Sequence, residues 1–183
     1  MKKSSLKFAL ALLVLVAFAV TGCGGGAPAA KPAESKDIKI GVVYELTGGT
    51  ASFGTAANNG TKLAFKEINA AGGVLGKQIT TVTADNKGEP SESANAMTKV
   101  ITQDKVVAVV GFTTSSNGIA GSAVNEANKI PFVAAATTNP KVTVDEKTGK
   151  AKPYTFRVCF IDPFQGTVGA NFVLKDLKLK KAV

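Results

Sequence analysis

Hydroxyl side chains in two short polar segments are the residues best suited to bind a small molecule. Four of them follow predicted strands: Ser115, Ser116, Thr137 and Thr138. Neither residues 111–117 nor residues 136–140 contain an ionisable side chain, which favours binding over catalysis. The first segment precedes a predicted helix, whose unpaired backbone amides and dipole would attract an anion. Two such segments at one crevice suit a small carboxylate, and the alternative is that the serines act as N-caps without a ligand.

Several kinds of enzyme site are excluded by composition. The chain has no His and no Trp, so it can form neither a Ser-His-Asp triad nor a His-ligated zinc site. Ala71 and Gln78 occupy positions where a phosphate-binding loop needs Gly and Ser or Thr. Asp85, Glu89 and Glu92 could bind a hard cation, but no metal-loop spacing joins them, and solvated loop charges are the simpler interpretation. We therefore expect a binding protein with no catalytic residues, no metal and no cofactor.

The spacing of apolar residues predicts the frame that carries the polar segments. Short apolar runs predict strands at residues 38–44, 78–84, 106–110, 130–135 and 154–160. Apolar steps of three and four predict helices between them, the first with Leu63 and Ile68 on its apolar stripe and its end at Gly72. This alternation indicates an α/β fold with a doubly wound, mostly parallel sheet, and the wholly apolar third strand is expected at its centre. Ligands of such sheets lie beyond the carboxyl ends of the strands.

The first residues have the pattern of an export signal. An unbroken run of 13 apolar residues, 8–20, follows Lys2, Lys3 and Lys7. As a helix this run would rise about 20 Å, which is too short to span a bilayer core of roughly 30 Å. The run ends in VTGC, which resembles the bacterial lipoprotein box with Cys23 as the lipidated residue. We expect residues 1–22 to be a lipoprotein signal peptide and residues 23–37, rich in Gly, Ala and Pro, to be a flexible tether.

The basic balance does not indicate nucleic-acid binding. The chain has 22 basic and 13 acidic residues, for a formal charge of +9, and removal of residues 1–22 would take away three of the lysines. The remaining lysines are scattered and form no basic stripe interleaved with aromatic residues. We expect an extracytoplasmic protein held on the bacterial membrane by its lipid, with no nucleic-acid partner.

Five blocks in one order resemble a known family. They are IKIGVVYELTGG, FKEINAAGGVLGKQI, VVAVVGFTTSS, IPFVAAATTNP and FRVCFIDPFQG. From Ile38 to Val183 the chain resembles the solute-binding lipoproteins of branched-chain amino-acid ABC transporters, the leucine/isoleucine/valine-binding type of the periplasmic-binding-protein superfamily. The resemblance implies a type I lobe over residues 38–183, an amino-acid ligand and an ABC permease as partner. Because such proteins are roughly twice this length and have two lobes, we expect an N-terminal fragment whose second lobe is missing.

The resemblance also implies roles for individual residues. It assigns the ligand carboxylate to the Ser115 hydroxyl, the ligand ammonium to the Ala136 carbonyl, and both groups to Thr138. Phe53 would line the side-chain pocket, and Ser116 and Thr137 flank these contacts. Similar proteins bind amides, urea, short peptides or aromatic acids, and some of them act as sensors, so such a ligand is the alternative.

One further feature departs from some relatives, which join the loops after the second and third strands by a disulfide. Here Gly88 and Thr114 stand at the corresponding places, so this disulfide is absent. Cys159 is then expected to be an unpaired, buried thiol.

Overall fold

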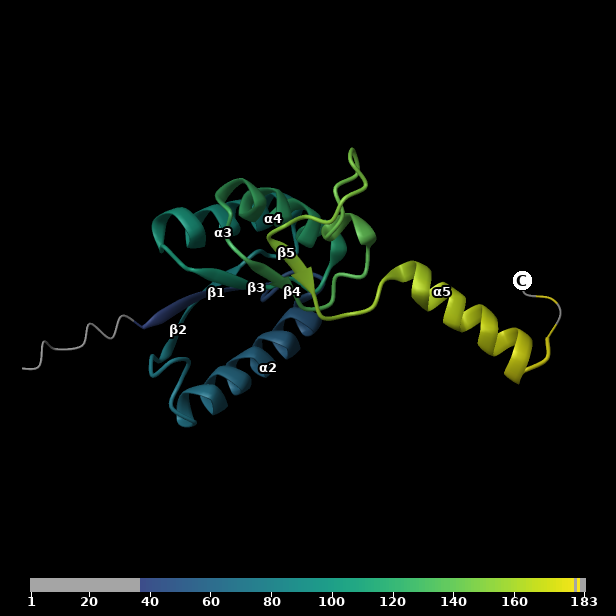
Figure 1. The fold of residues 1–183 in the computed structure, drawn as a ribbon, viewed down its shortest axis with the longest axis horizontal. Helices are drawn as coiled ribbons and strands as arrows, with labels where there is room; N and C mark the ends of the chain where they lie inside the picture. The colour runs from purple at the N-terminus through teal and green to yellow at the C-terminus, as the bar shows by residue number, and fades with distance from the viewer. Residues whose placement is uncertain (1–36, 180, 182–183) are drawn as a thin grey trace, which may run out of the picture. The chain divides into compact units, whose positions relative to one another are not determined.

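Five parallel strands form the centre of the protein in a computed structural model, which describes residues 37–179 and residue 181 (Figure 1). The strands are β1 (Ile38–Tyr44), β2 (Ile79–Asp85), β3 (Ala108–Gly111), β4 (Phe132–Ala134) and β5 (Thr155–Arg157). Their order is β2-β1-β3-β4-β5, so the wholly apolar third strand is central, as predicted. The predicted α/β, doubly wound sheet is confirmed, and every strand pair in it is parallel.

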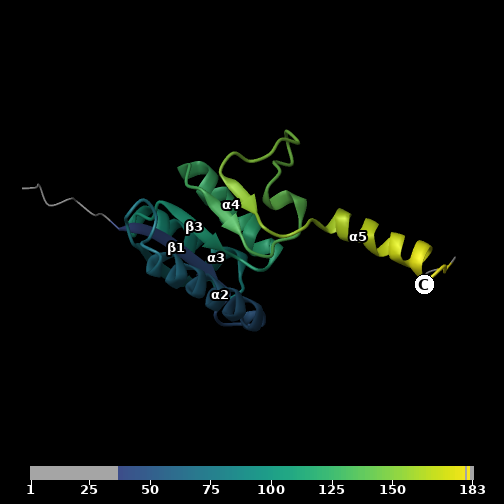
Figure 2. The same ribbon diagram turned by 60° about the horizontal axis from the view of Figure 1, so that its bottom comes forward.

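Helices lie on both faces of this sheet. They are α2 (Ala51–Ala70), α3 (Pro90–Thr98), α4 (Ser115–Asn128) and α5 (Asp162–Asn171), with the shorter turns η1 (Lys99–Gln103), η2 (Pro140–Val142) and η3 (Phe172–Asp176). α2 covers one face, and α3 packs against α4 on the other face (Figures 1 and 2). α5 has no buried residue. Within the described residues, no helix combines the length and the apolar character that crossing a bilayer requires.

The main hydrophobic core lies between the sheet and the pair α3 and α4. Val109 and Phe132 are in register on neighbouring strands and are both fully buried on this face. The Phe112 ring meets the Phe132 ring edge to face, with 5.3 Å between the ring centroids. Gly121 of α4 makes room for this pair, because a Cβ atom there would lie 2.5 Å from the Phe112 ring.

α2 contacts the sheet through a different face from the one its apolar pattern suggests. Leu63 is 56% exposed and Ile68 is 37% exposed, whereas the buried residues of α2 are Gly54 and Asn58. The helix is held by polar contacts and close approach, including a 2.9 Å hydrogen bond between the hydroxyls of Tyr44 and Thr61. The face of α2 that meets the sheet is therefore the one that carries Gly54, Asn58 and Thr61.

Some predictions fall outside the described residues or change in detail. The signal peptide, Cys23 and almost all of the tether lie in residues 1–36, which the structure does not describe. Cys159 carries no disulfide in the described part of the chain, but it is half-buried rather than buried.

Candidate ligand-binding site

A cavity of about 560 Å³ opens at the edge of the sheet where the strands end. Its lining residues come from the first turns of α2 and from the loops after β3 and β4: Ser52, Phe53, Ala56, Ala57, Thr113 and Ala136. Two of the predicted site residues, Phe53 and Ala136, therefore meet in one cavity although they are far apart in sequence. None of the lining side chains is ionisable, so the cavity itself offers an apolar wall, hydroxyl groups and backbone groups.

Phe53 owes its position to the residue that follows it. Gly54 packs so closely on the end of β1 that a Cβ atom there would lie 2.0 Å from the Glu45 carbonyl oxygen. This contact places the first turn of α2 beside the sheet edge and leaves the Phe53 ring 66% exposed at the cavity. The ring is thus available for contact with an apolar group.

Ser115 and Ser116 form the first turn of α4. The N-cap is Thr114 and makes no side-chain capping bond, so the expectation that the serines are N-caps is wrong. The Ser115 hydroxyl accepts a 3.2 Å hydrogen bond from the Asn139 backbone amide, which joins the loops after β3 and β4. Among the described residues, none accepts a hydrogen bond from the backbone amides of Ser115 and Ser116. These donors remain available at the positive end of the helix dipole.

The loop after β4 presents its predicted residues in three different ways. Ala136 is exposed, and Thr138 is half-buried with its carbonyl accepting a 3.1 Å bond from the Asp162 amide. Thr137 is fully buried. It lies against Gly118 of α4 so closely that a Cβ atom on Gly118 would be 2.7 Å from the Thr137 methyl group. Its role as a ligand contact, like those of the other predicted site residues, stays a prediction.

Arg157 of β5 holds this loop in shape. Its guanidinium donates to the Thr137 carbonyl at 2.7 Å, to the Pro140 carbonyl at 3.2 Å and to the Thr143 hydroxyl at 2.5 Å. The guanidinium is planar and carries several N–H donors in fixed directions, so it can donate hydrogen bonds to several oxygens of one loop at once. The geometry of the segment around Thr138 thus depends on a residue of the neighbouring strand.

Glu45 is an ionisable residue at this edge that is not among the predicted site residues. It follows β1 directly and is fully buried. Its carboxylate accepts hydrogen bonds from the Thr113 hydroxyl at 2.7 Å, the Thr114 hydroxyl at 3.0 Å and the Asn117 amide at 3.0 Å, as well as from backbone amides of both threonines. Burial raises the pKa of Glu45, but the bonds from Asn117 and Thr113 outweigh burial, so the pKa lies below its ordinary value. A charged residue directly after a buried strand was the available sequence signal.

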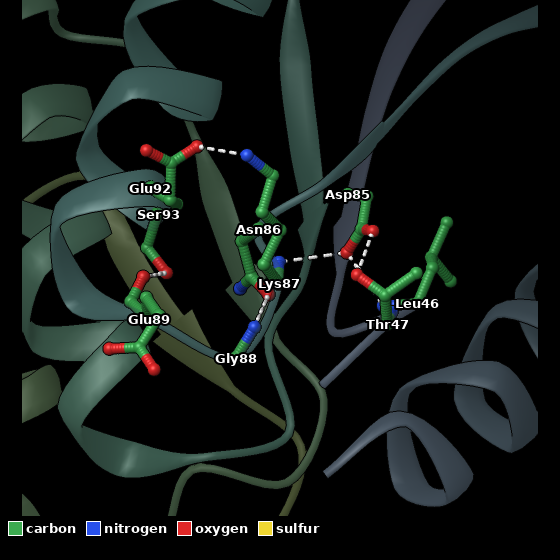
Figure 3. Close-up of polar contacts among 9 residues, drawn as sticks. All are labelled: Leu46, Thr47, Asp85, Asn86, Lys87, Gly88, Glu89, Glu92 and Ser93. Carbon is green, nitrogen blue, oxygen red and sulfur yellow. Dashed lines mark hydrogen bonds and ion pairs between the residues drawn. The ribbon is translucent and has the colours of Figure 1, made fainter. Parts of the chain in front are cut away.

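Asp85 plays a comparable part at the end of β2 (Figure 3). Its carboxylate accepts from the Leu46 amide at 2.9 Å, the Thr47 hydroxyl at 2.6 Å and the Lys87 amide at 2.8 Å. Lys87 in turn pairs with Glu92 at 3.3 Å. Of the three carboxylates considered as cation ligands, Asp85 and Glu92 are therefore engaged in these contacts, and no group of three or more His, Cys, Asp or Glu in the described part of the chain is arranged to hold a metal ion.

Acid should weaken the fold through these two carboxylates. Burial raises the pKa of both groups, but their hydrogen bonds together outweigh it and hold the pKa of Glu45 below 4.5 and that of Asp85 below 3.8. The unfolded chain then binds more protons than the folded chain, so stability is full above these ordinary values and is lost as the pH falls through the lowered pKa values. We expect the urea concentration at the unfolding midpoint to decrease as the pH is lowered from about 6 to about 3. In Asp85→Asn this decrease should be smaller. An unchanged wild-type midpoint would contradict the expectation.

Comparisons with known proteins agree with this geometry. The family model described as "Periplasmic binding protein" matches residues 37–183. The chain belongs to the periplasmic binding protein family. It is 38% identical over 145 residues to an amino acid binding protein of Pseudomonas aeruginosa, covering 79% of this chain and 37% of the relative. It is 36% identical over 173 residues to Leu/Ile/Val-binding protein homolog 3 of Brucella melitensis, covering 94% of this chain and 44% of the relative.

Solved structures place the chain within the same family. The substrate binding protein LivJ of a branched-chain amino acid transporter from Streptococcus pneumoniae, in complex with isoleucine, is 41% identical with a TM-score of 0.71, over 78% of this chain and 39% of that chain. The leucine binding protein LivK of Thermotoga maritima is 38% identical with a TM-score of 0.68, over 77% of this chain and 38% of that chain. A solute binding protein of an ABC transporter from Rhodopseudomonas palustris, in complex with 3,4-dihydroxybenzoic acid, is 25% identical with a TM-score of 0.67, over 76% and 36%. This periplasmic binding protein spans less than half the length of these relatives.

Proposed function

We propose that this periplasmic binding protein is the solute-binding component of an ABC importer, which captures a branched-chain or related amino acid outside the cytoplasm and delivers it to a permease. The observation that carries the proposal is the cavity at the sheet edge, where Phe53 and Ala136 meet Thr113, two residues before the first turn of α4, whose backbone amides have no acceptor among the described residues. The isoleucine complex of the pneumococcal relative supports the same ligand class.

The proposed mechanism divides the ligand into three parts. The α-carboxylate accepts hydrogen bonds from the Ser115 hydroxyl and from the backbone amides of Ser115 and Ser116. The ammonium group donates to the Ala136 carbonyl and to Thr138, with Thr137 holding the backbone between them. Hydrogen bonds to charged groups contribute about 1.5 to 3 kcal/mol each, but they are common to every amino acid.

Choice among amino acids rests on the apolar wall. Phe53, Ala56 and Ala57 line the cavity, and burying an aliphatic side chain against them contributes about 1.5 to 3 kcal/mol. This is enough to favour leucine, isoleucine or valine over alanine. A hinged second lobe, as implied by the family, would then exclude water from the bound ligand.

The N-terminal part of the proposal concerns location. We infer that residues 1–22 are removed, that Cys23 carries the lipid, and that residues 23–37 hold the lobe of residues 38–183 away from the membrane. This arrangement would keep the binding protein close to its permease at the outer face of the cytoplasmic membrane. Its support is the VTGC pattern after an apolar run of 13 residues.

A second candidate keeps the fold and changes the ligand. An amide, urea, short peptide or aromatic acid would use the same sheet edge. The relative from Rhodopseudomonas palustris was solved in complex with 3,4-dihydroxybenzoic acid, which favours an aromatic acid among these alternative ligands. The relatives of higher identity named above favour an amino acid, so we retain the amino acid as the principal ligand.

Ser115→Ala and Thr138→Ala test the proposal. Each removes a hydrogen bond to a charged group of the ligand, so each should weaken L-leucine binding by about tenfold or more. Isothermal titration and amide NMR shifts would measure strong and weak binding respectively. Thr98→Ala is a matched control, because the Thr98 hydroxyl bonds only within α3. Unchanged leucine affinity in both site variants would remove these residues from the site.

A further inference from the structure

The Glu45 carboxylate places a buried negative charge directly behind the first turn of α4. Its hydrogen-bond donors are hydroxyls and amides of Thr113, Thr114 and Asn117, all of which are neutral. Within the described residues, no Lys or Arg forms an ion pair with it. The charge is therefore satisfied by hydrogen bonds but is not cancelled by a cation.

This charge lies one residue behind the cavity wall. Thr113 gives both its amide and its hydroxyl to Glu45, and Thr113 also lines the cavity. No other ionisable side chain lines the cavity or accepts a bond from its lining residues in the described part of the chain. Because Glu45 is fully buried, salt screens its field less than that of a surface carboxylate.

The sign of this field opposes that of the helix. An isolated helix N-terminus carries about half a positive charge and favours any carboxylate. The full negative charge of Glu45 lies at the same end of α4 and opposes it. A simple carboxylate keeps the hydrogen bonds from the first turn of α4 but meets this charge uncompensated, whereas an amino acid offsets the repulsion with its ammonium group.

We propose that Glu45 is a specificity-determining residue whose buried carboxylate makes this cavity select zwitterionic amino acids over simple carboxylates of the same shape. The inference rests on the proposed function, because it takes the ligand to bind in the cavity formed by Phe53, Thr113 and Ala136. Glu45 does not touch the ligand in this arrangement. It acts through its charge and through the threonines that it holds.

Three ligands of one shape provide the test in the wild-type protein. They are L-leucine, its des-amino analogue 4-methylpentanoate, and its des-carboxy analogue 3-methylbutylamine. NMR titration at pH 7, followed at the amides of Thr113 and Ser116, should give an affinity order of leucine, then amine, then carboxylate. A carboxylate that binds more tightly than the amine would overturn the proposal without any substitution.

Glu45→Gln then separates charge from structure. We expect the ratio of 4-methylpentanoate affinity to leucine affinity to rise at least tenfold, because the repulsion of the anion is removed. Glu126→Gln is a matched control near the other end of α4: Glu126 accepts bonds from the Tyr154 amide and the Thr155 hydroxyl, and it does not line the cavity. Its ratio should equal that of the wild type.

The outcomes distinguish the two proposals. Equal weakening of both ligands in Glu45→Gln would mean that Glu45 acts only on structure, and would overturn its role in specificity while leaving the proposed function intact. Loss of leucine binding in the wild type, with the amine still preferred to the carboxylate, would overturn the proposed function and support the role of Glu45. Absence of binding for all three ligands would overturn both.

Discussion

Gly54→Ala should destabilise the protein by about 3 kcal/mol, at the upper end of what overpacking usually costs. The added methyl group would lie 2.0 Å from the Glu45 carbonyl oxygen, 2.6 Å from its carbonyl carbon and 2.8 Å from its amide nitrogen. All three are backbone atoms at the end of β1, so they cannot turn away as a side chain could. α2 must therefore shift, and the Phe53 side of the cavity must move with it. Urea unfolding followed by circular dichroism would measure the loss.

Gly60→Ala is the matched control for this substitution. It makes the same change in the same helix, but no atom beyond the neighbouring helix backbone lies within 4 Å of the position where its Cβ would be placed. Alanine is the better helix former, so this variant should gain about 0.5 to 1 kcal/mol. Equal effects from the two substitutions would show that helix propensity, rather than contact with β1, sets the effect at Gly54.

Phe112→Ala should cost about 3 to 5 kcal/mol, the range found for removing a buried aromatic ring. Phe112 is fully buried, contacts Phe132 edge to face and fills the space left by Gly121. Its loss would leave a cavity between the sheet and α4, directly beside the residues that hold the Glu45 carboxylate. The free energy of unfolding in urea would measure the effect.

Phe156→Ala serves as the comparison. Phe156 is 51% exposed on β5, so its removal should cost less than about 1 kcal/mol. A Phe112→Ala variant as stable as Phe156→Ala would mean that the main core lies elsewhere.

The sheet was the part of the fold that the sequence predicted best. The run IKIGVVY predicts β1 with its observed ends, and the wholly apolar run before Gly111 correctly predicts the central strand. Both succeed because a strand covered on two faces is a nearly continuous apolar run, which leaves a clear pattern. The fifth strand is shorter than predicted, since pairing with β4 involves only Thr155–Arg157.

The face of α2 could not be predicted from periodicity. The pattern of Leu63 and Ile68 indicates a buried stripe, yet the helix meets the sheet through Gly54, Asn58 and the Thr61 hydroxyl. Such contacts depend on which partner atoms face the helix in three dimensions. Sequence spacing carries no information about those partners.

The candidate site was predicted in part. In a parallel sheet the carboxyl ends of the strands lie at one edge, so the loops after them were expected to lie close together. The cavity does bring Phe53 and Ala136 together. Glu45 was missed because an acidic residue at the start of a loop is ordinarily solvated. Its burial becomes evident only when the loop carrying Thr113 and Thr114 is placed beside it.

The bond between the Asp162 amide and the Thr138 carbonyl links the start of α5 to the loop proposed to grip the ligand's ammonium group. Arg157, the last residue of β5, donates a hydrogen bond to the Thr137 carbonyl of the same loop. The chain that leaves the sheet is thus tied to this loop at the end of β5 and again at the start of α5, so a displacement of α5 would move the Thr138 carbonyl directly.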